Sequence, residues 1–310
     1  MTLKLVVTAI DDSTPGIRSV TFADPGGQEL PGFVPGSHLA IEVADKVNAY
    51  SLTGCGVAPR QYTISVLRVT DGAGSTYVHE QLDIGDTLIA RLPRSAFPPI
   101  ARARRHLLIA GGIGVTPIVS HLRAARRWGR ETKVLYSFRD GHGAHLDDIK
   151  VLAPDAELIT DGPEHFMERL IPTLADQPLG THLYVCGPAA MIDAVVAAAT
   201  AGGWPPSRIH FERFALDALA PGEPFTAKLT KSDRTVEVAA GTSLLEALEQ
   251  AGVPVPNLCR QGVCGECRVP VVSGRPLHRD LFLTDDEKRS GTALMACVSR
   301  CEGPALEVAL

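Results

Sequence analysis

The chain has 310 residues, of which 45% are hydrophobic and 21% are charged, and its formal net charge is −5. This length exceeds one ordinary core, so two or three domains of about 100 residues each are expected. The modest charge gives no reason to expect a nucleic acid or an anionic membrane as a partner, and no apolar run approaches the ~20 residues of a membrane helix. The apolar N-terminus is interrupted at Asp11 and Asp12 and is typical of a strand rather than a signal peptide, which predicts a cytoplasmic protein.

Residues 1–102 are expected to form an antiparallel β-barrel domain. Short strand-like segments alternate here with turns rich in glycine, proline and aspartate, a pattern typical of barrels and sandwiches. The predicted strands are 3–10, 17–22, 38–43, 62–69 and 87–92.

Residues 103–214 have a different pattern, which predicts an α/β domain with a doubly wound parallel sheet. A continuous apolar segment at 106–110 indicates a strand buried on both faces, and strands and helices alternate after it. The further strands are predicted at 133–138, 157–160, 182–186 and 208–211, and the helices after residue 117, around 166–174 and at 189–201.

Residues 215–224 are expected to be a linker, and residues 225–310 a third domain that begins with a hairpin, 225–230 and 235–239. Ser243 and Glu246 have the spacing of a capping box at the start of a helix, and Gly252 supplies its end.

Four of the seven cysteines lie in this third domain with a diagnostic spacing. Cys259, Cys264 and Cys267 follow the pattern C-x4-C-x2-C, and Cys297 comes 29 residues later. This is the signature of a plant-type [2Fe–2S] cluster. Structural zinc usually requires two C-x2-C pairs, and the second pair is absent. From spacing alone Cys301 competes with Cys297 as the fourth ligand.

A glycine-rich turn at Gly111, Gly112 and Gly114 lies between a predicted strand and a predicted helix. Such a turn allows the backbone to approach a pyrophosphate at a helix N-terminus. The spacing differs from G-x-G-x-x-G, so the common dinucleotide fingerprint is not present. A purely structural glycine turn is the alternative.

Three weaker motifs each have a structural alternative. Tyr50 and Ser51 could contact a flavin ring or belong to an ordinary strand. The segment 74–76 could bind a phosphate at a helix N-terminus or provide an ordinary N-cap. Cys186 ends a predicted parallel strand, where doubly wound sheets bind ligands, but a lone buried cysteine is usually a small hydrophobic residue.

The whole chain resembles the phthalate dioxygenase reductase family, the reductases that supply electrons to Rieske oxygenases and include vanillate demethylase reductases. The resemblance rests on the cysteine loop and on the ordered segments 50–52, 92–97, 110–117, 184–188, 210–212 and 295–299. It implies a Greek-key flavin barrel of the ferredoxin-reductase type, an α/β NAD domain and an α+β plant-type ferredoxin domain, with FMN, NADH and a [2Fe–2S] cluster as cofactors.

The resemblance also implies site residues. Tyr50 and Ser51 match the isoalloxazine contacts, and Ser51 and Cys186 match the residues at the reacting rings. The phosphate segment of FMN matches Gly74, Ser75 and Thr76; the nicotinamide-nucleotide side matches Gly111, Gly112, Gly114, Thr116, Cys186, Gly187 and Pro188; and the fourth cluster ligand matches Cys297.

One position departs from the family pattern. Asn48 stands where the family usually has an arginine that pairs with the flavin phosphate, and an amide cannot form that charged pair. We expect Lys46, Arg60 or Arg68, together with helix N–H groups, to supply the missing charge.

Arg139 and Asp140 follow the strand predicted at 133–138. An acidic side chain there suits a ribose diol, and the family's Arg-Asp pair accompanies NADH, so NADH is the expected donor. The resemblance implies electron transfer from NADH to FMN, to the cluster and to a terminal Rieske oxygenase. The alternatives are a diaphorase for another acceptor, such as a cytochrome P450, and a redox-sensing iron–sulfur protein. Glu212 and the histidines, including His38 and His210, receive no proton-transfer role.

Overall fold

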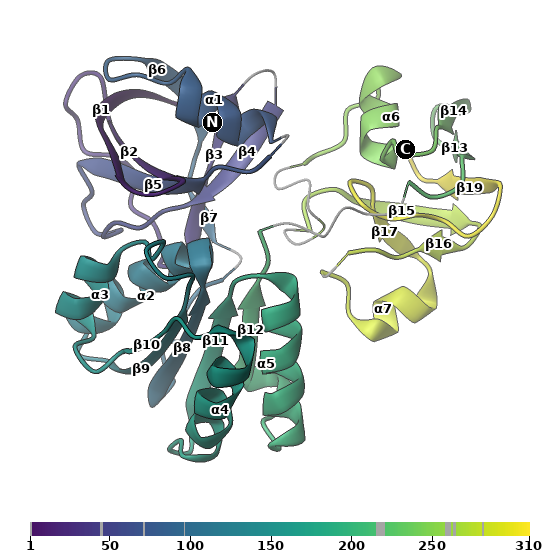
Figure 1. The fold of residues 1–310 in the computed structure, drawn as a ribbon. Helices are drawn as coiled ribbons and strands as arrows, with labels where there is room; N and C mark the ends of the chain where they lie inside the picture. Colours follow the sequence, from purple (N-terminus) through teal and green to yellow (C-terminus); the bar gives the residue numbers. More distant parts are fainter. Residues whose placement is uncertain are drawn as a thin grey trace. The chain divides into compact units, whose positions relative to one another are not determined.

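The computed structural model describes residues 2–43, 46–70, 72–95, 97–214, 221–257, 262, 265–280 and 282–310. The chain divides into two compact units, Met1–Arg213 and Phe214–Leu310, which are described separately (Figure 1). Within the described residues, no helix combines the length and apolar character needed to cross a membrane.

The first unit begins with an antiparallel barrel sheet in the order β4-β3-β6-β1-β2-β5, with β7 paired to β3. Side chains alternate along these strands, so that Phe22, Leu39, Tyr62 and Ile64 are fully buried in one core. The elements are β1 (Thr2–Thr14), β2 (Ile17–Ala23), β3 (Ser37–Val43), β4 (Lys46–Ser51), β5 (Gln61–Leu67), α1 (Ala73–Glu80), β6 (Thr87–Arg91) and β7 (Arg94–Ser95).

A parallel sheet in the order β10-β9-β8-β11-β12 completes the first unit. Its core holds Leu107, Ile109 and Leu183 against α4 and α5, while α2 and α3 lie on the opposite side of the sheet (Figure 1). The elements are β8 (Arg105–Gly111), η1 (Gly112–Gly114), α2 (Val115–Arg127), β9 (Glu131–Ser137), α3 (Leu146–Leu152), β10 (Glu157–Ile159), α4 (Gly162–Ala175), β11 (Thr181–Cys186), α5 (Ala189–Ala201), η2 (Pro206–Arg208) and β12 (Ile209–Glu212).

Polar contacts fasten the barrel to the parallel sheet. Ser65 Oγ lies 2.9 Å from His145 Nε2, and Arg123 Nε donates to the Thr53 carbonyl at 3.0 Å. The segment between the two sheets is held as well, because the Ile100 amide donates to Tyr184 Oη at 2.7 Å. The carboxyl ends of β8 and β11 are thereby held beside the barrel.

The second unit contains a mixed sheet in the order β14-β13-β19-β15-β17 and a short β16-β18 pair. Both predicted hairpin strands are present, and Ser243 and Glu246 form the expected capping box at the start of α6. The elements are β13 (Phe225–Leu229), β14 (Arg234–Val238), α6 (Leu244–Gln250), β15 (Arg268–Ser273), β16 (Pro276–Leu277), α7 (Asp285–Ser290), β17 (Ala293–Met295), β18 (Arg300–Cys301) and β19 (Ala305–Val308).

Candidate functional site

Asn48 of β4 lies directly against the first turn of α1. A Cβ placed on Gly74 would stand 2.6 Å from Asn48 Nδ2 and 3.0 Å from Oδ1, so only glycine leaves room for this amide. Asn48 Nδ2 is buried and has no hydrogen-bond partner in the described part of the chain. A buried donor without a partner costs free energy, and a phosphate at the start of the helix would satisfy it.

The segment 74–76 is placed at the N-terminus of α1, as the phosphate hypothesis requires. The first helical hydrogen bond runs from the Thr76 amide to the Gly72 carbonyl, so the amides before Thr76 have no acceptor within the helix. Ser75 Oγ donates to the carbonyls of Gly72 and Val69 at 3.0 and 3.3 Å, which holds the preceding loop. The N-cap residue is Gly72, which offers no side chain, so the segment is not a side-chain N-cap.

The three basic residues expected to replace the missing arginine differ in what surrounds them. Arg68 forms an ion pair with Glu80 in the last turn of α1, so its charge is already matched. Arg60 is exposed immediately before β5. The Lys46 side chain lies outside the described side chains. Asn48 and the helix amides are therefore the donors that the structure brings together here.

Tyr50 and Ser51 end β4 on opposite faces of the sheet. Tyr50 is half-buried against the barrel core, and desolvation raises the pKa of its phenol to about 12. Ser51 is opposite His38 on β3, and His38 is also opposite Arg94 on β7. Burial, followed by the charge of Arg94, lowers the pKa of His38 to about 4, so this imidazole is neutral beside Ser51.

The two loops predicted to bind the nicotinamide nucleotide meet at the carboxyl ends of β8 and β11. A Cβ on Gly114 would lie 2.6 Å from the Gly187 amide nitrogen, and a Cβ on Gly111 would lie 2.7 Å from Pro188 Cδ. Both glycines are therefore required by the close packing of the two loops, Gly114 against backbone and Gly111 against side chains. Gly112 differs, because its φ is +50° and the space around its Cβ position is open.

The hydroxyl groups of Tyr136 and Thr116 stabilise the glycine turn by hydrogen bonds to its carbonyls. Tyr136 Oη donates to the Gly112 carbonyl at 3.2 Å and accepts from the Ala144 amide at 3.0 Å. Thr116 Oγ1 donates to the Ile113 carbonyl at 3.0 Å, so its hydroxyl is committed to the turn. The Thr116 side chain thus stabilises the turn through this hydrogen bond to the backbone.

Cys186 and Glu212 lie side by side at the ends of neighbouring parallel strands. Cys186 is fully buried, and burial followed by the nearby Glu212 raises the pKa of its thiol. Burial raises the pKa of Glu212 to about 8, and its Oε2 has no hydrogen-bond partner within the described residues. Glu212 is therefore a neutral acid near pH 7, a feature that sequence reasoning left unassigned because burial cannot be read from the motif.

Asp140 follows β9 and is exposed, with Oδ1 accepting from the Gly141 amide at 3.0 Å. Since β9 neighbours β8 in the parallel sheet, Asp140 lies at the same edge as the glycine turn. This is the edge where doubly wound sheets bind nucleotides.

In the second unit, Cys267 and Cys297 approach each other. Their sulfur atoms are 3.1 Å apart, well beyond a disulfide bond of about 2.05 Å. Two thiolates on one tetrahedral metal at about 2.3 Å stand roughly 3.8 Å apart, so this pair is close to the geometry of two ligands sharing an iron. Cys259 and Cys264 lie outside the described residues. The Cys301 thiol instead donates a hydrogen bond to the Ala305 carbonyl at 3.2 Å, which favours Cys297 over Cys301 as the fourth ligand.

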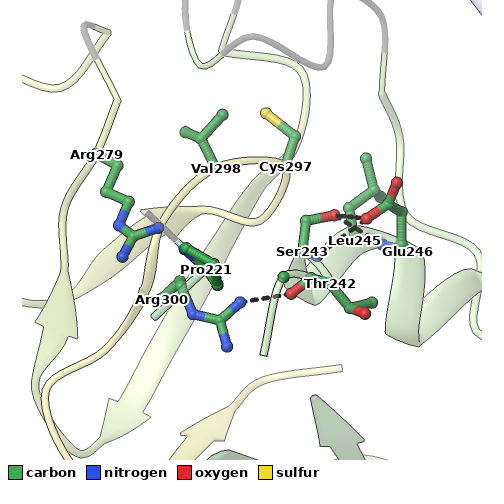
Figure 2. Close-up of a pocket in the computed structure, with 10 residues that line it drawn as sticks. Pro221, Thr242, Ser243, Leu245, Glu246, Arg279, Cys297, Val298 and Arg300 are labelled. Atoms are coloured by element: carbon green, nitrogen blue, oxygen red, sulfur yellow. Dashed lines mark hydrogen bonds between the residues drawn. The ribbon is translucent and has the colours of Figure 1, made fainter. Parts of the chain in front are cut away.

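Beside Cys297 is a pocket of about 180 Å³. Figure 2 shows Cys297 and Val298 on one side, Ser243 and Glu246 on another, and the guanidinium groups of Arg279 and Arg300 across from them. Of these residues, only Cys297 was expected at the cluster, because the pocket combines segments distant along the chain.

Two family models match the chain. The 2Fe-2S iron-sulfur cluster binding domain matches residues 227–302, and the N-terminal domain of dimethylamine monooxygenase subunit DmmA-like proteins matches residues 86–209.

Full-length relatives are similar as well. The heme-dependent oxidative N-demethylase beta subunit of Ectopseudomonas mendocina is 41% identical, with 98% of each chain covered. The carnitine monooxygenase reductase subunit of Acinetobacter baumannii is 36% identical over 97% of this chain and 96% of its own.

Solved structures agree with these relatives. Phthalate dioxygenase reductase, described as a modular structure for electron transfer from pyridine nucleotides to [2Fe–2S], has a TM-score of 0.83 and 34% identity over 100% of this chain and 98% of its own. An intact type IV self-sufficient cytochrome P450 monooxygenase has a TM-score of 0.79 and 31% identity over 100% of this chain and 41% of its own.

Proposed function

Since the chain belongs to the phthalate dioxygenase reductase family, we propose that it is the NADH-dependent reductase component of a multicomponent oxygenase or demethylase system. Electrons pass from NADH through FMN and a [2Fe–2S] cluster to a partner oxygenase. The observation that carries this proposal is the similarity over the whole chain to reductases of this kind. We further propose a cytoplasmic location and the division into a flavin domain (1–102), an NAD domain (103–214), a linker (215–224) and a ferredoxin domain (225–310).

The FMN phosphate would be held by the amide of Asn48 and the first-turn amides of α1. The buried, unpaired Asn48 Nδ2 and the space left by Gly74 support this assignment. Tyr50 would contact the isoalloxazine, and Ser51, kept beside the neutral His38, would lie at its reacting edge. When bound, the flavin accepts a hydride and passes electrons on singly, a chemistry that belongs to the cofactor.

The nicotinamide nucleotide would be bound by the glycine turn, the segment 186–188 and Asp140. The protein's role is to position the nicotinamide, because hydride transfer needs no general acid or base. Tyr136 fixes the Gly112 carbonyl, and the packing of Gly114 against Gly187 fixes the two loops relative to each other. Glu212, neutral at pH 7, adds no negative charge beside Cys186. We propose Cys259, Cys264, Cys267 and Cys297 as the cluster ligands.

The partner has two candidate classes. A Rieske oxygenase is the first, from the family resemblance. A heme-dependent oxygenase is the second, favoured by the similarity to the beta subunit of a heme-dependent oxidative N-demethylase and to 41% of the chain of a self-sufficient cytochrome P450 monooxygenase. The comparison with the DmmA-like model makes amine demethylation the reaction to test for this second class.

The test is reduction of the purified holoprotein by NADH, followed by electron paramagnetic resonance of the reduced cluster. We expect flavin bleaching, then a reduced [2Fe–2S] signal, then its loss when a competent oxygenase is added. A protein whose cluster stays oxidised with NADH in excess would contradict the proposal. Adding Rieske and heme oxygenases separately identifies the acceptor class.

A further inference from the structure

Arg300 is a buried cation in the second unit for which the described residues supply no carboxylate partner. Its side chain is only 3% exposed, and it donates to the carbonyls of Thr242, Glu223 and Ala239 at 2.5, 2.9 and 3.1 Å. Within the described residues no ion pair neutralises it, and Nε has no hydrogen-bond partner. A buried charge is costly unless an opposite charge accompanies it.

A second guanidinium increases this cost. A Cβ on Gly222 would stand 2.6 Å from Arg300 Nε and 2.9 Å from Arg279 Nη2, so these nitrogens are at most 5.5 Å apart, the sum of the two distances. Burial and then the charge of Arg279 lower the pKa of Arg300. Two like charges this close disfavour each other. The backbone of Gly222, with φ of +69°, packs against both groups, so no side chain fits there.

The pair of guanidinium groups suits an oxyanion. Guanidinium groups donate charge-assisted hydrogen bonds to carboxylates and phosphates, and both arginines line the same pocket. The pocket of about 180 Å³ that both arginines line has room for a carboxylate or a phosphate (Figure 2). Its acidic wall residue, Glu246, is already committed to the capping box with Ser243.

Cys297 is another wall of this pocket. An anion in the pocket therefore lies near the fourth ligand proposed for the cluster. Charges in neighbouring sites of a protein interior interact strongly enough to change each other's binding and redox equilibria. An anion in the pocket then disfavours reduction of the cluster, and reduction of the cluster weakens the binding of the anion by the same factor.

We propose that the pocket between Arg279 and Arg300 is a binding site for an oxyanion, a carboxylate or a phosphate, whose occupancy lowers the reduction potential of the neighbouring cluster. The anion supplies the charge that Arg300 lacks. Its binding involves neither NADH nor the flavin, so the inference can fail or succeed independently of electron delivery from NADH.

The first experiment is calorimetric titration of the oxidised holoprotein with inorganic phosphate and with acetate, against sodium chloride at matched ionic strength. We expect saturable binding of an oxyanion that Arg279→Gln weakens by at least about tenfold. Arg275→Gln is the matched control, because Arg275 is exposed and paired with Glu302 outside the pocket. A hexaglutamate peptide distinguishes a protein carboxylate from a free small anion as the source.

The second experiment measures the midpoint potential of the cluster by dithionite titration with and without the oxyanion. If the anion binds tenfold more weakly to the reduced protein, saturation lowers the midpoint by about 59 mV for this one-electron couple. Arg279→Gln should abolish the shift and Arg275→Gln should retain it. Equal responses to chloride and oxyanion, or a midpoint insensitive to the anion in the wild type, would overturn the proposal. Gly222→Ala, whose Cβ would clash with Arg300 Nε and Arg279 Nη2, should displace the guanidinium groups and weaken binding without removing either charge.

Discussion

Substituting Gly74 by alanine tests the contact between β4 and α1 that defines the proposed phosphate site. The new Cβ would meet Asn48 Nδ2 at 2.6 Å and Cγ at 2.7 Å, closer than side-chain atoms tolerate. Overpacking of this kind costs about 1–3 kcal/mol, and alanine returns up to about 1 kcal/mol of helix propensity. We therefore expect the free energy of unfolding to fall by roughly 0–3 kcal/mol, with the Asn48 amide displaced.

The effect on FMN should be larger than the effect on stability. A hydrogen bond to a charged group contributes about 1.5–3 kcal/mol, so displacing the amide should weaken FMN binding by about 10- to 100-fold. Asn48→Ala should weaken FMN binding to the same extent. The double variant should regain stability, because the clash is gone, but not FMN affinity, because the donor is still absent.

The assay is fluorescence titration of deflavinated protein with FMN, combined with urea unfolding of the same variants. Gly303→Ala is the stability control, since nothing lies within 4 Å of its Cβ position and its φ is ordinary. If Asn48→Ala binds FMN as tightly as the wild type, the amide does not contact the phosphate. If the double variant recovers full FMN affinity, Gly74 serves packing alone.

Three shorter predictions concern other residues. Cys297→Ser should abolish the visible absorbance of the cluster, whereas Cys301→Ser should retain it, since the Cys301 thiol faces the Ala305 carbonyl. Burial raises the pKa of Glu212 to about 8 from 4.5. Because the unfolded chain releases this proton at lower pH than the folded chain, the free energy of unfolding should fall as pH rises between those values, by at most about 1.4 kcal/mol per pH unit. Urea unfolding of Glu212→Gln should no longer show this fall. Asp140→Ser should raise the kcat/KM for NADPH relative to NADH, and an unchanged ratio would remove Asp140 from nucleotide selection.

The elements of the fold were largely predictable because their signals are local. The strand predicted at 17–22 is observed as Ile17–Ala23, and the helix at 189–201 is observed as Ala189–Ala201. The capping box of Ser243 and Glu246 formed as its spacing indicated. The helix Leu146–Leu152 was not anticipated, since its short segment lacks a strong period and its N-cap, His145, has φ of +56° and makes no side-chain cap bond.

The candidate site was predictable in its parts and not in its contacts. The glycine motif indicated a tight turn, but the sequence could not reveal that Gly114 and Gly187 face each other, because that depends on the adjacency of β8 and β11. In place of the family arginine we expected another cation, whereas the structure places the Asn48 amide, without a hydrogen-bond partner in the described part of the chain, against Gly74. Burial likewise decided the protonation of Glu212, which no motif encodes.

Two sites of this chain share one feature: a glycine packs against a buried hydrogen-bond donor. At Gly74 the missing Cβ admits the Asn48 amide, and at Gly222 it admits two guanidinium nitrogens. Each site has a buried donor that finds no partner among the described residues: Asn48 Nδ2 in one and Arg300 Nε in the other. A buried donor without an acceptor destabilises the folded chain. A ligand oxygen that accepts from the donor would remove this cost at both sites. In the proposed arrangement the phosphate of FMN would satisfy the first donor, and an anion beside the cluster would satisfy the second.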